Sequence, residues 1–178
     1  MLLSGGHTLL VLVRNLSDYI VLGSTLDDSV GEAIDKAARY INLPWKKGEN
    51  GGLAASFVDA AERARKRFDH NYTPCNFSIP SSNRIKTSLD FSFAGLKSEF
   101  KRKFDELTSS GVPNFLEQQD TVDVLAMSFL DACSQHISDR LNNAMRRLSV
   151  DDCYAETPVI ISGGVARNSY LVSRYITF

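Results

Sequence analysis

Two Ser-Gly-Gly triplets are the residues of this chain whose types and spacing best fit the chemistry of phosphate binding. Residues 4–6 follow the apolar pair Leu2 and Leu3, and residues 162–164 follow the apolar run 158–161. Because glycine carries no Cβ, a Gly-Gly turn lets backbone N–H groups approach a phosphate or a nucleotide closely. Two such turns predict one nucleotide held between two lobes.

Each triplet also has a purely structural interpretation. The first, Ser4, Gly5 and Gly6, can be an ordinary β-hairpin whose glycines take positive φ. The second can be a tight strand-to-helix turn with an asparagine at the helix start. We expect residues 158–162 to form a buried strand and Asn168 to lie in the first turn of the next helix, where its amide can reach a ligand.

Two further positions fit a nucleotide site without deciding for it. Asp35 lies on the polar face of an expected helix, either as a solvated acid paired with Lys36 or Arg39 or as a carboxylate that accepts from ribose hydroxyls. Gly52 precedes another helix, either as a flexible loop end or as backbone that makes room for a sugar or base at a helix start.

The middle of the chain is locally basic, although the whole chain has a net charge of only -1. A run of charge is usually a solvated face. It can also contact the phosphates of RNA. The residues concerned are Arg63, Arg65, Lys66, Arg67, Arg84, Lys86, Lys97, Lys101, Arg102 and Lys103.

The elements that position these residues follow from hydrophobic periodicity. Strands are expected at 1–3, 9–14 and 19–24, joined as a meander, and residues 88–93 should be a short strand or extended. Ser29 and Glu32 fit a capping box for a helix ending near Ile41. Helices are expected at 53–67, 94–107, 120–148 and from 167 onward. This mixture predicts an α/β fold.

Bulk composition is that of a globular protein, with 178 residues of which 43% are hydrophobic. The three cysteines are widely spaced and form no zinc pattern. No apolar run reaches membrane-spanning length. Because the first and last residues resemble the interior of elements, we expect a piece of a longer fold, truncated at both ends.

The chain resembles the TsaD family of tRNA threonylcarbamoyladenosine synthases, once called glycoproteases. The segments that carry the resemblance are Leu-Ser-Gly-Gly-His-Thr at 3–8, Leu-Gly-Ser-Thr-Leu-Asp-Asp at 22–28, Gly-Glu-Ala-Ile-Asp-Lys at 31–36, Leu-Asp-Phe-Ser-Phe-Ala-Gly-Leu-Lys at 89–97 and Ser-Gly-Gly-Val-Ala-Arg-Asn at 162–168. The family implies an incomplete actin-like, Hsp70-like ATPase fold. Residues 1–42 would belong to the N-terminal lobe, and 43–178 to a helical insertion and the truncated C-terminal lobe.

The resemblance also implies an activity and its participants. The reaction is transfer of threonylcarbamoyl from threonylcarbamoyl-AMP to N6 of adenosine 37 in tRNAs reading ANN codons. The partners implied are tRNA, a separate synthase that supplies the adenylate, and a homodimer or other family subunits, with no membrane. The wording of the motifs resembles the bacterial and mitochondrial branch, which favours mitochondria over the cytoplasm.

Substrate contacts are carried over by the resemblance onto Leu2, Leu3, Ser4, Gly5, Gly6, Asp35, Gly52 and Asn168. The position of Gly52 departs from the family, which has Pro-Gly-Gly-Pro where this chain has Lys-Gly-Glu-Asn-Gly-Gly-Leu at 47–53. The family's divalent metal ion, iron or zinc, would have its His-x-x-x-His and Asp ligands outside these residues. No residue is a convincing general base.

Two other functions remain open. Another actin-like enzyme, such as a sugar or acid kinase, would need a catalytic Asp, for which Asp27 and Asp28 are the candidates. A catalytically incomplete chain would act only by binding a partner.

Overall fold

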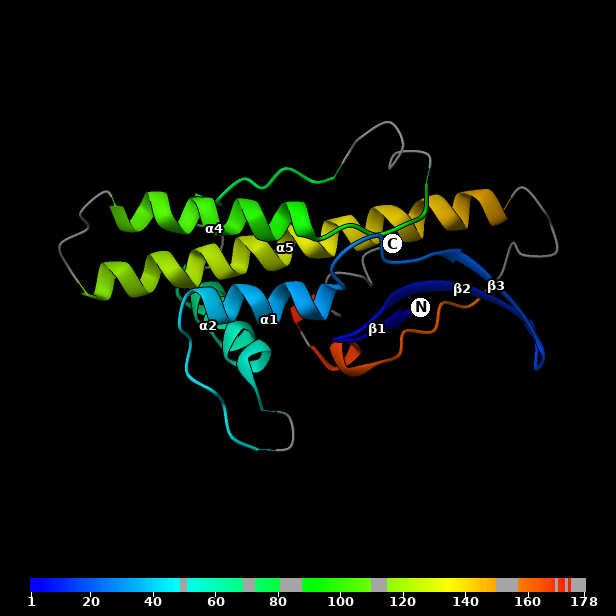
Figure 1. Ribbon diagram of the computed structural model, residues 1–178, viewed down its shortest axis with the longest axis horizontal. Helices are drawn as coiled ribbons and strands as arrows, with labels where there is room; N and C mark the ends of the chain where they lie inside the picture. Colours follow the sequence, from blue (N-terminus) through cyan, green and yellow to red (C-terminus); the bar gives the residue numbers. More distant parts are fainter. Residues whose placement is uncertain are drawn as a thin grey trace.

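The computed structural model describes residues 1–48, 51–68, 73–80, 88–109, 115–149, 157–168, 170, 171 and 173. These residues form a mixed α/β structure with one three-stranded sheet and four α-helices (Figure 1). The helices α1, α4 and α5 run alongside one another, and the sheet lies beyond one end of α1. Within this described part, no helix is both long and apolar enough to cross a bilayer.

The sheet is the expected meander. β1 (Leu2–Leu3), β2 (Thr8–Asn15) and β3 (Asp18–Gly23) are antiparallel and follow the order β1-β2-β3. Burial alternates along β2, because successive side chains of a strand point to opposite faces. Leu10 and Leu12 therefore enter the core, whereas Val13 remains 60% exposed.

The first helix begins where its capping residues predict. α1 spans Val30–Tyr40, and the Ser29 hydroxyl accepts a hydrogen bond from the Glu32 N–H at 3.2 Å. This side-chain bond satisfies one of the N–H groups that have no partner at a helix start. α2 spans Leu53–Phe68, close to the expected range.

The remaining two helices pack lengthwise. α4 spans Ala94–Ser109, and α5 spans Phe115–Leu148, beginning before the expected Asp120. The sequence from 115 to 119 has no apolar periodicity, but leucine, glutamate and glutamine are good helix formers, so the helix extends through them.

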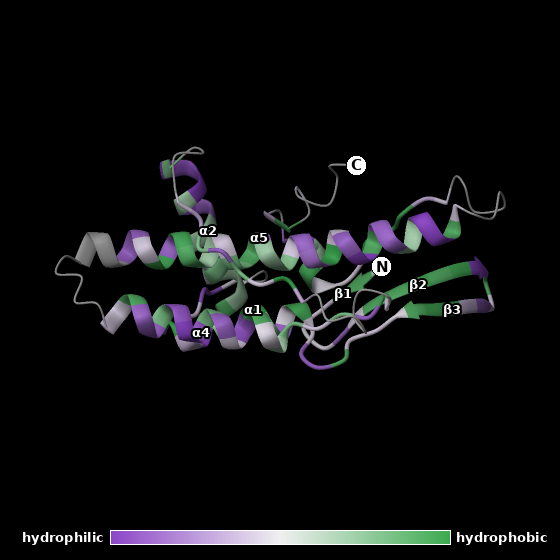
Figure 2. Cartoon of the chain, turned by 90° about the horizontal axis from the view of Figure 1, so that it is seen from above, coloured by the Kyte–Doolittle hydropathy of each residue, from purple (hydrophilic) through white to green (hydrophobic). Residues whose placement is uncertain are grey.

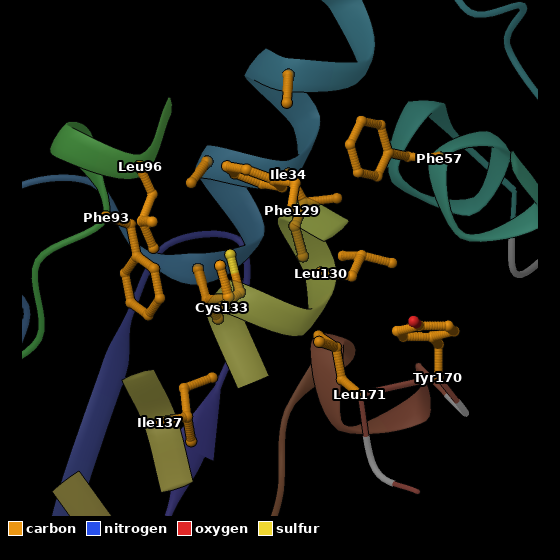
Figure 3. Packing of buried hydrophobic residues seen from close by; sticks show 14 of the residues in the cluster. Ile34, Phe57, Phe93, Leu96, Phe129, Leu130, Cys133, Ile137, Tyr170 and Leu171 are labelled. Atoms are coloured by element: carbon orange, nitrogen blue, oxygen red, sulfur yellow. The ribbon is translucent and has the colours of Figure 1, made fainter. Parts of the chain in front are cut away.

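An aromatic cluster joins three of the helices. The ring of Phe129 on α5 lies 5.8 Å from Phe57 on α2 and 5.1 Å from Phe100 on α4. All three side chains are fully buried. Figure 3 shows Phe57 and Phe129 beside Ile34 of α1, so the core lies where the helices meet.

The expectation of a buried strand at 158–162 is wrong. Ile160 is 73% exposed, and the segment forms one isolated parallel bridge, from Leu2 to Ser162. An apolar run of this length suggests a buried strand with a neighbour on each side. In the described chain, only the segment around β1 pairs with it. Residues 88–93 are likewise extended, with a single bridge from Thr25 to Phe91.

Candidate functional site

The structure places the two Ser-Gly-Gly triplets side by side. The Leu3 N–H donates to the Ser162 carbonyl at 2.7 Å, and the Ser162 N–H donates to the Met1 carbonyl at 2.9 Å. Gly163 has φ +108°, and a Cβ there would lie 2.2 Å from the Leu3 carbonyl oxygen. The two triplets therefore touch through backbone. Since the Leu3 side chain is fully buried, only its backbone can face a ligand.

The first triplet forms a turn that is closed by Ser4. The Ser4 N–H donates to the His7 carbonyl at 2.9 Å, and the Ser4 hydroxyl accepts from the N–H groups of Gly6 and His7 and donates to the His7 carbonyl. These three bonds use the whole capacity of a hydroxyl. Ser4 therefore shapes the turn, and its hydroxyl must exchange a partner before it can bind anything else.

Gly5 and Gly6 lie in the hairpin between β1 and β2, as the structural interpretation has it, but neither takes the positive φ of that interpretation. The turn spans four residues, and loops of that length are most often built around a type I turn, which needs no positive φ. A Cβ at either glycine would meet no atom within 4 Å. The tip of the turn is therefore open to an approaching ligand.

Hydroxyl groups fasten this turn to the start of α1. The Ser29 hydroxyl donates to the Gly5 carbonyl at 2.7 Å, and the buried Thr8 hydroxyl accepts from the Val30 N–H at 3.0 Å. Thr25 completes the link by accepting from the Thr8 N–H. Thr8 therefore has a structural role here.

Gly31 is the point at which all three segments meet. A Cβ on Gly31 would lie 2.7 Å from the Ser4 carbonyl oxygen, 2.8 Å from Gly5 Cα and 2.8 Å from Val165 Cγ2. We call Ser4, Gly5, Gly31, Gly163 and Val165 the two-turn junction. Sequence reasoning missed Gly31, although a glycine inside a helical pattern is a signal of close packing.

Asp35 lies one helical turn beyond Gly31, on the same face of α1. Its carboxylate accepts from the Arg39 guanidinium at 2.9 Å, and both side chains are more than one third exposed. This pair is the one that the structural interpretation of Asp35 expected. An exposed pair of this kind contributes about 0.2–1 kcal/mol, so a ligand can displace Arg39 at little cost.

Asn168 lies outside the helical turn in which we expected it. Gly164–Arg167 form a short 3-10 helix, η2, and Asn168 is its C-terminal cap. The Asn168 Oδ1 accepts from the Leu171 N–H at 3.2 Å, which is the pattern of a residue that caps a following turn. The cap uses Oδ1 and leaves Nδ2 as the donor for a ligand.

Gly52 lies at the start of α2 in the loop that follows α1. It has φ +110°, and its N–H donates to the Lys46 carbonyl at 2.8 Å. A Cβ on Gly52 would lie 3.9 Å from the ring of Trp45. Its described contacts are with this loop and with Ser56, so the structure does not join it to the two-turn junction.

Both candidate kinase acids have structural partners. Asp27 accepts from the Phe93 N–H at 2.8 Å and from the Ser92 hydroxyl at 2.5 Å, at the start of α4. Asp28 is paired with Lys36 at 2.6 Å and with Lys97. Burial raises the pKa of Asp28, but hydrogen bonds from the two lysines outweigh it and hold the pKa below its usual value.

The basic end of α2 is largely neutralised by acids. Arg63 donates two hydrogen bonds to the Asp123 carboxylate, at 2.8 and 2.7 Å, and Arg67 pairs with Asp120 at 2.8 Å. A groove of about 380 Å³ lies between α2 and α5 at this place. Two members of the expected basic patch, Arg84 and Lys86, fall outside the described residues.

Comparison with known proteins decides the family. A family model described as "TsaD: tRNA N6-adenosine threonylcarbamoyltransferase" matches residues 1–177. The chain belongs to the TsaD family. It is 37% identical over 172 residues to the tRNA N6-adenosine threonylcarbamoyltransferase of Brucella anthropi, and 38% identical over 173 residues to that of Brucella ovis. Each match covers 96% of this chain and 42% of the relative, so the chain spans about two fifths of the length of these curated TsaD relatives.

Proposed function

We propose that this TsaD chain is part of an enzyme that transfers the threonylcarbamoyl group of threonylcarbamoyl-AMP to N6 of adenosine 37 in tRNAs reading ANN codons. The observation that carries the proposal is the two-turn junction. It brings together, through Leu3 and Ser162, two motifs that lie at opposite ends of a chain matched to the family over 1–177.

The junction suits an adenylate for three physical reasons. The open tip at Gly5 and Gly6 lets a phosphate reach backbone without meeting a side chain. The Ser29 bond to Gly5 places this tip at the start of α1, where the helix dipole favours negative charge. Asp35, on the same face of α1, can accept from ribose hydroxyls once Arg39 is displaced.

The contribution of these residues would be binding and positioning. The exocyclic amine of adenine is a weak nucleophile, so holding the adenylate and the base in reactive geometry supplies much of the rate. Backbone N–H groups at a phosphate also offset the charge that grows on the leaving group. Substrate contacts are accordingly proposed for Leu2, Leu3, Ser4, Gly5, Gly6, Asp35 and Asn168, and for Gly52 through its loop.

The divalent ion implied by the family does not fit the described residues. Among them, no three His, Cys, Asp or Glu side chains lie close enough to hold a metal ion. His136, for example, is fully buried and accepts the Ser92 N–H through Nε2. No step of the reaction is therefore assigned to an ion held by this part of the chain.

The larger setting is proposed on the same ground of family membership. We place residues 1–42 in the N-terminal lobe of an actin-like fold and 43–178 in its helical insertion and C-terminal lobe. A homodimer or other family subunits, and a separate synthase for the adenylate, complete the system. A mitochondrial location is proposed from the resemblance of the motifs to the bacterial and mitochondrial branch, with the cytoplasm as the alternative.

The test uses a polypeptide of the relatives' full length that contains this sequence. It is incubated with threonylcarbamoyl-AMP and unmodified tRNA, and the modified nucleoside is measured by mass spectrometry after digestion of the tRNA. We expect product from the full-length protein, a large loss with Asp35→Asn, and none from the 178-residue chain alone. Tight tRNA binding without product would instead favour a binding role, and phosphorylation of a small sugar or acid would favour a kinase.

A further inference from the structure

Trp45 is a large aromatic side chain that the fold leaves in solvent. It is 68% exposed and is the single tryptophan among the 178 residues. It lies in the loop between α1 and α2, which extends away from the other helices (Figure 1). Exposing an indole costs free energy that a polar residue at this place would avoid.

The backbone around Trp45 is held firmly. The Ser56 hydroxyl of α2 donates to the Pro44 carbonyl at 2.5 Å, and the Gly52 N–H donates to the Lys46 carbonyl at 2.8 Å. Lys46 and Gly52 thereby form an antiparallel bridge directly after Trp45. The residues before and after Trp45 are therefore both held by hydrogen bonds, which fix the backbone that carries the indole.

Glycines make this presentation possible. A Cβ on Gly51 would lie 2.1 Å from the Lys46 carbonyl oxygen, and Gly52 takes φ +110°, a backbone conformation that residues with a Cβ rarely adopt. A side chain at Gly51 would push the bridge apart, and one at Gly52 would strain the backbone. The two glycines thus allow the bridge that holds the backbone next to Trp45.

Positive charge follows the indole directly. Lys46 pairs with Asp59 at 2.6 Å, whereas Lys47 is an exposed residue one position further on. An aromatic face next to a cation is the pair of groups with which proteins bind single-stranded nucleic acid, by stacking on the base and attracting the phosphate.

We propose that Trp45 stacks on a nucleobase and that Lys47 attracts the phosphate attached to it. The inference rests on the proposed function, because that function supplies two nucleobases: the adenine of the adenylate and an unpaired base of the tRNA anticodon loop. Both present the same flat surface to the indole.

Fluorescence of the full-length protein tests the contact directly. Subtracting the emission of Trp45→Phe from that of the unaltered protein isolates the signal of this tryptophan. We expect the signal to be quenched by adenosine monophosphate if the adenylate is the source, and by an anticodon stem-loop RNA if the tRNA is. Shielding of Trp45 from acrylamide before any ligand is added would overturn the proposal, because protein would then cover the ring.

Binding measurements give a second, independent readout. Loss of one stacked base weakens binding by about 5- to 150-fold, so Trp45→Ala should raise the Kd of the quenching ligand within that range. Trp45→Phe keeps an aromatic face and should retain most of the affinity. Lys47→Ala should reduce the salt dependence of RNA binding by about one unit of slope.

Tyr19→Ala is the matched control, because Tyr19 is also an exposed aromatic residue but lies on the sheet. It should leave both ligands bound as before. Unchanged Kd values for Trp45→Ala would overturn the stacking proposal even if the enzyme forms product. If the full-length protein forms no modified tRNA but its Trp45 fluorescence is still quenched by ligand, the proposed function is overturned and the stacking contact is supported.

Discussion

Gly31 of α1 packs so closely against both turns of the candidate site that a Cβ has no room there. We expect Gly31→Ala to destabilise the protein by about 1–3 kcal/mol, the usual cost of forcing an extra methyl group into packed atoms. Two of its three close contacts are backbone atoms of Ser4 and Gly5, which cannot rotate away. Chemical denaturation measures the loss, and binding of the adenylate should weaken with it.

Gly95→Ala is the control for Gly31→Ala. Gly95 is also in the first turn of a helix, but a Cβ there would meet nothing within 4 Å. Alanine should be neutral or should stabilise α4 by up to about 1 kcal/mol. Equal stability changes for the two variants would show that the junction is not tightly packed.

His136 is a titratable residue inside the core, and its ring lies nearly perpendicular to the neighbouring rings of Phe91 and Phe93. Burial, with a smaller contribution from the nearby Arg140 and against the attraction of Asp27, lowers the pKa of His136 to about 4. In the unfolded chain, His136 has its ordinary pKa of 6.5. Stability should therefore fall as the pH drops from 6.5 toward 4, by about 3 kcal/mol in all.

Unfolding measured across this range checks the assignment to His136. His136→Gln removes the proton-binding group and keeps an acceptor for the Ser92 N–H. Its stability should change less between pH 6.5 and 4 than that of the unaltered protein. Equal pH dependence of stability for His136→Gln and the unaltered protein would contradict the prediction. Asp90 does not interfere, because a hydrogen bond from Ser88 holds its pKa below 3.8 and its contribution to stability is lost only at lower pH.

Among the elements, α4 depends on a carboxylate from a distant segment. Asp27 accepts from the N–H groups of Phe93 and Ala94 at the helix start. Asp27→Ala should cost about 1–2 kcal/mol, since it removes a helix cap and a charge that favours the helix dipole. Thermal melting measures it. Asp18→Ala, which removes an exposed 3.8 Å pair with Arg14, should change stability by less than 0.5 kcal/mol.

The sequence predicts helices well where their caps and periodicity agree. It predicts the segment 158–162 wrongly, as a buried strand. Ser29 and Glu32 mark the start of α1 because a cap is a local interaction. Residues 158–162 look like a strand because composition reports only apolarity, whereas pairing depends on which segments lie on both sides. The start of α5 was placed too late because periodicity is absent there, although helix propensity is not.

The candidate site was predictable only in its outline. The two triplets could be found by motif, but their contact through Leu3 and Ser162 is a tertiary feature. Ser4 was expected to face a ligand, and the structure uses its hydroxyl to close the turn. Hydrogen-bond partners of this kind are chosen in three dimensions, so residue type alone cannot assign them.

At the scale of the whole molecule, the outer face of the sheet leaves apolar side chains exposed among the described residues. Val13, Tyr19 and Val21 share this face and are each more than half exposed, and β2 and β3 are largely hydrophobic (Figure 2). Apolar surface of this kind promotes association.

We therefore expect the 178-residue chain, produced alone, to self-associate as its concentration rises. Sedimentation velocity measures this directly. Val13→Thr with Val21→Thr keeps β-branched side chains and should increase the monomer fraction. A Leu16→Thr control changes an exposed apolar residue in the β2–β3 turn and should have a smaller effect. A monomer at every concentration would contradict the prediction.

The hydrogen bond between Leu3 and Ser162 also has a consequence for how the protein folds as it is synthesised. A ribosome adds about 5–20 residues per second, so the first triplet waits roughly 10–30 seconds for its neighbour to be synthesised. During that interval β1 can pair only with β2, and the nascent chain has no complete site. Contacts between such distant residues also slow folding, because the loop they close must be ordered first. A message that ends before the codon for Ser162 would yield helices and a hairpin, but no junction.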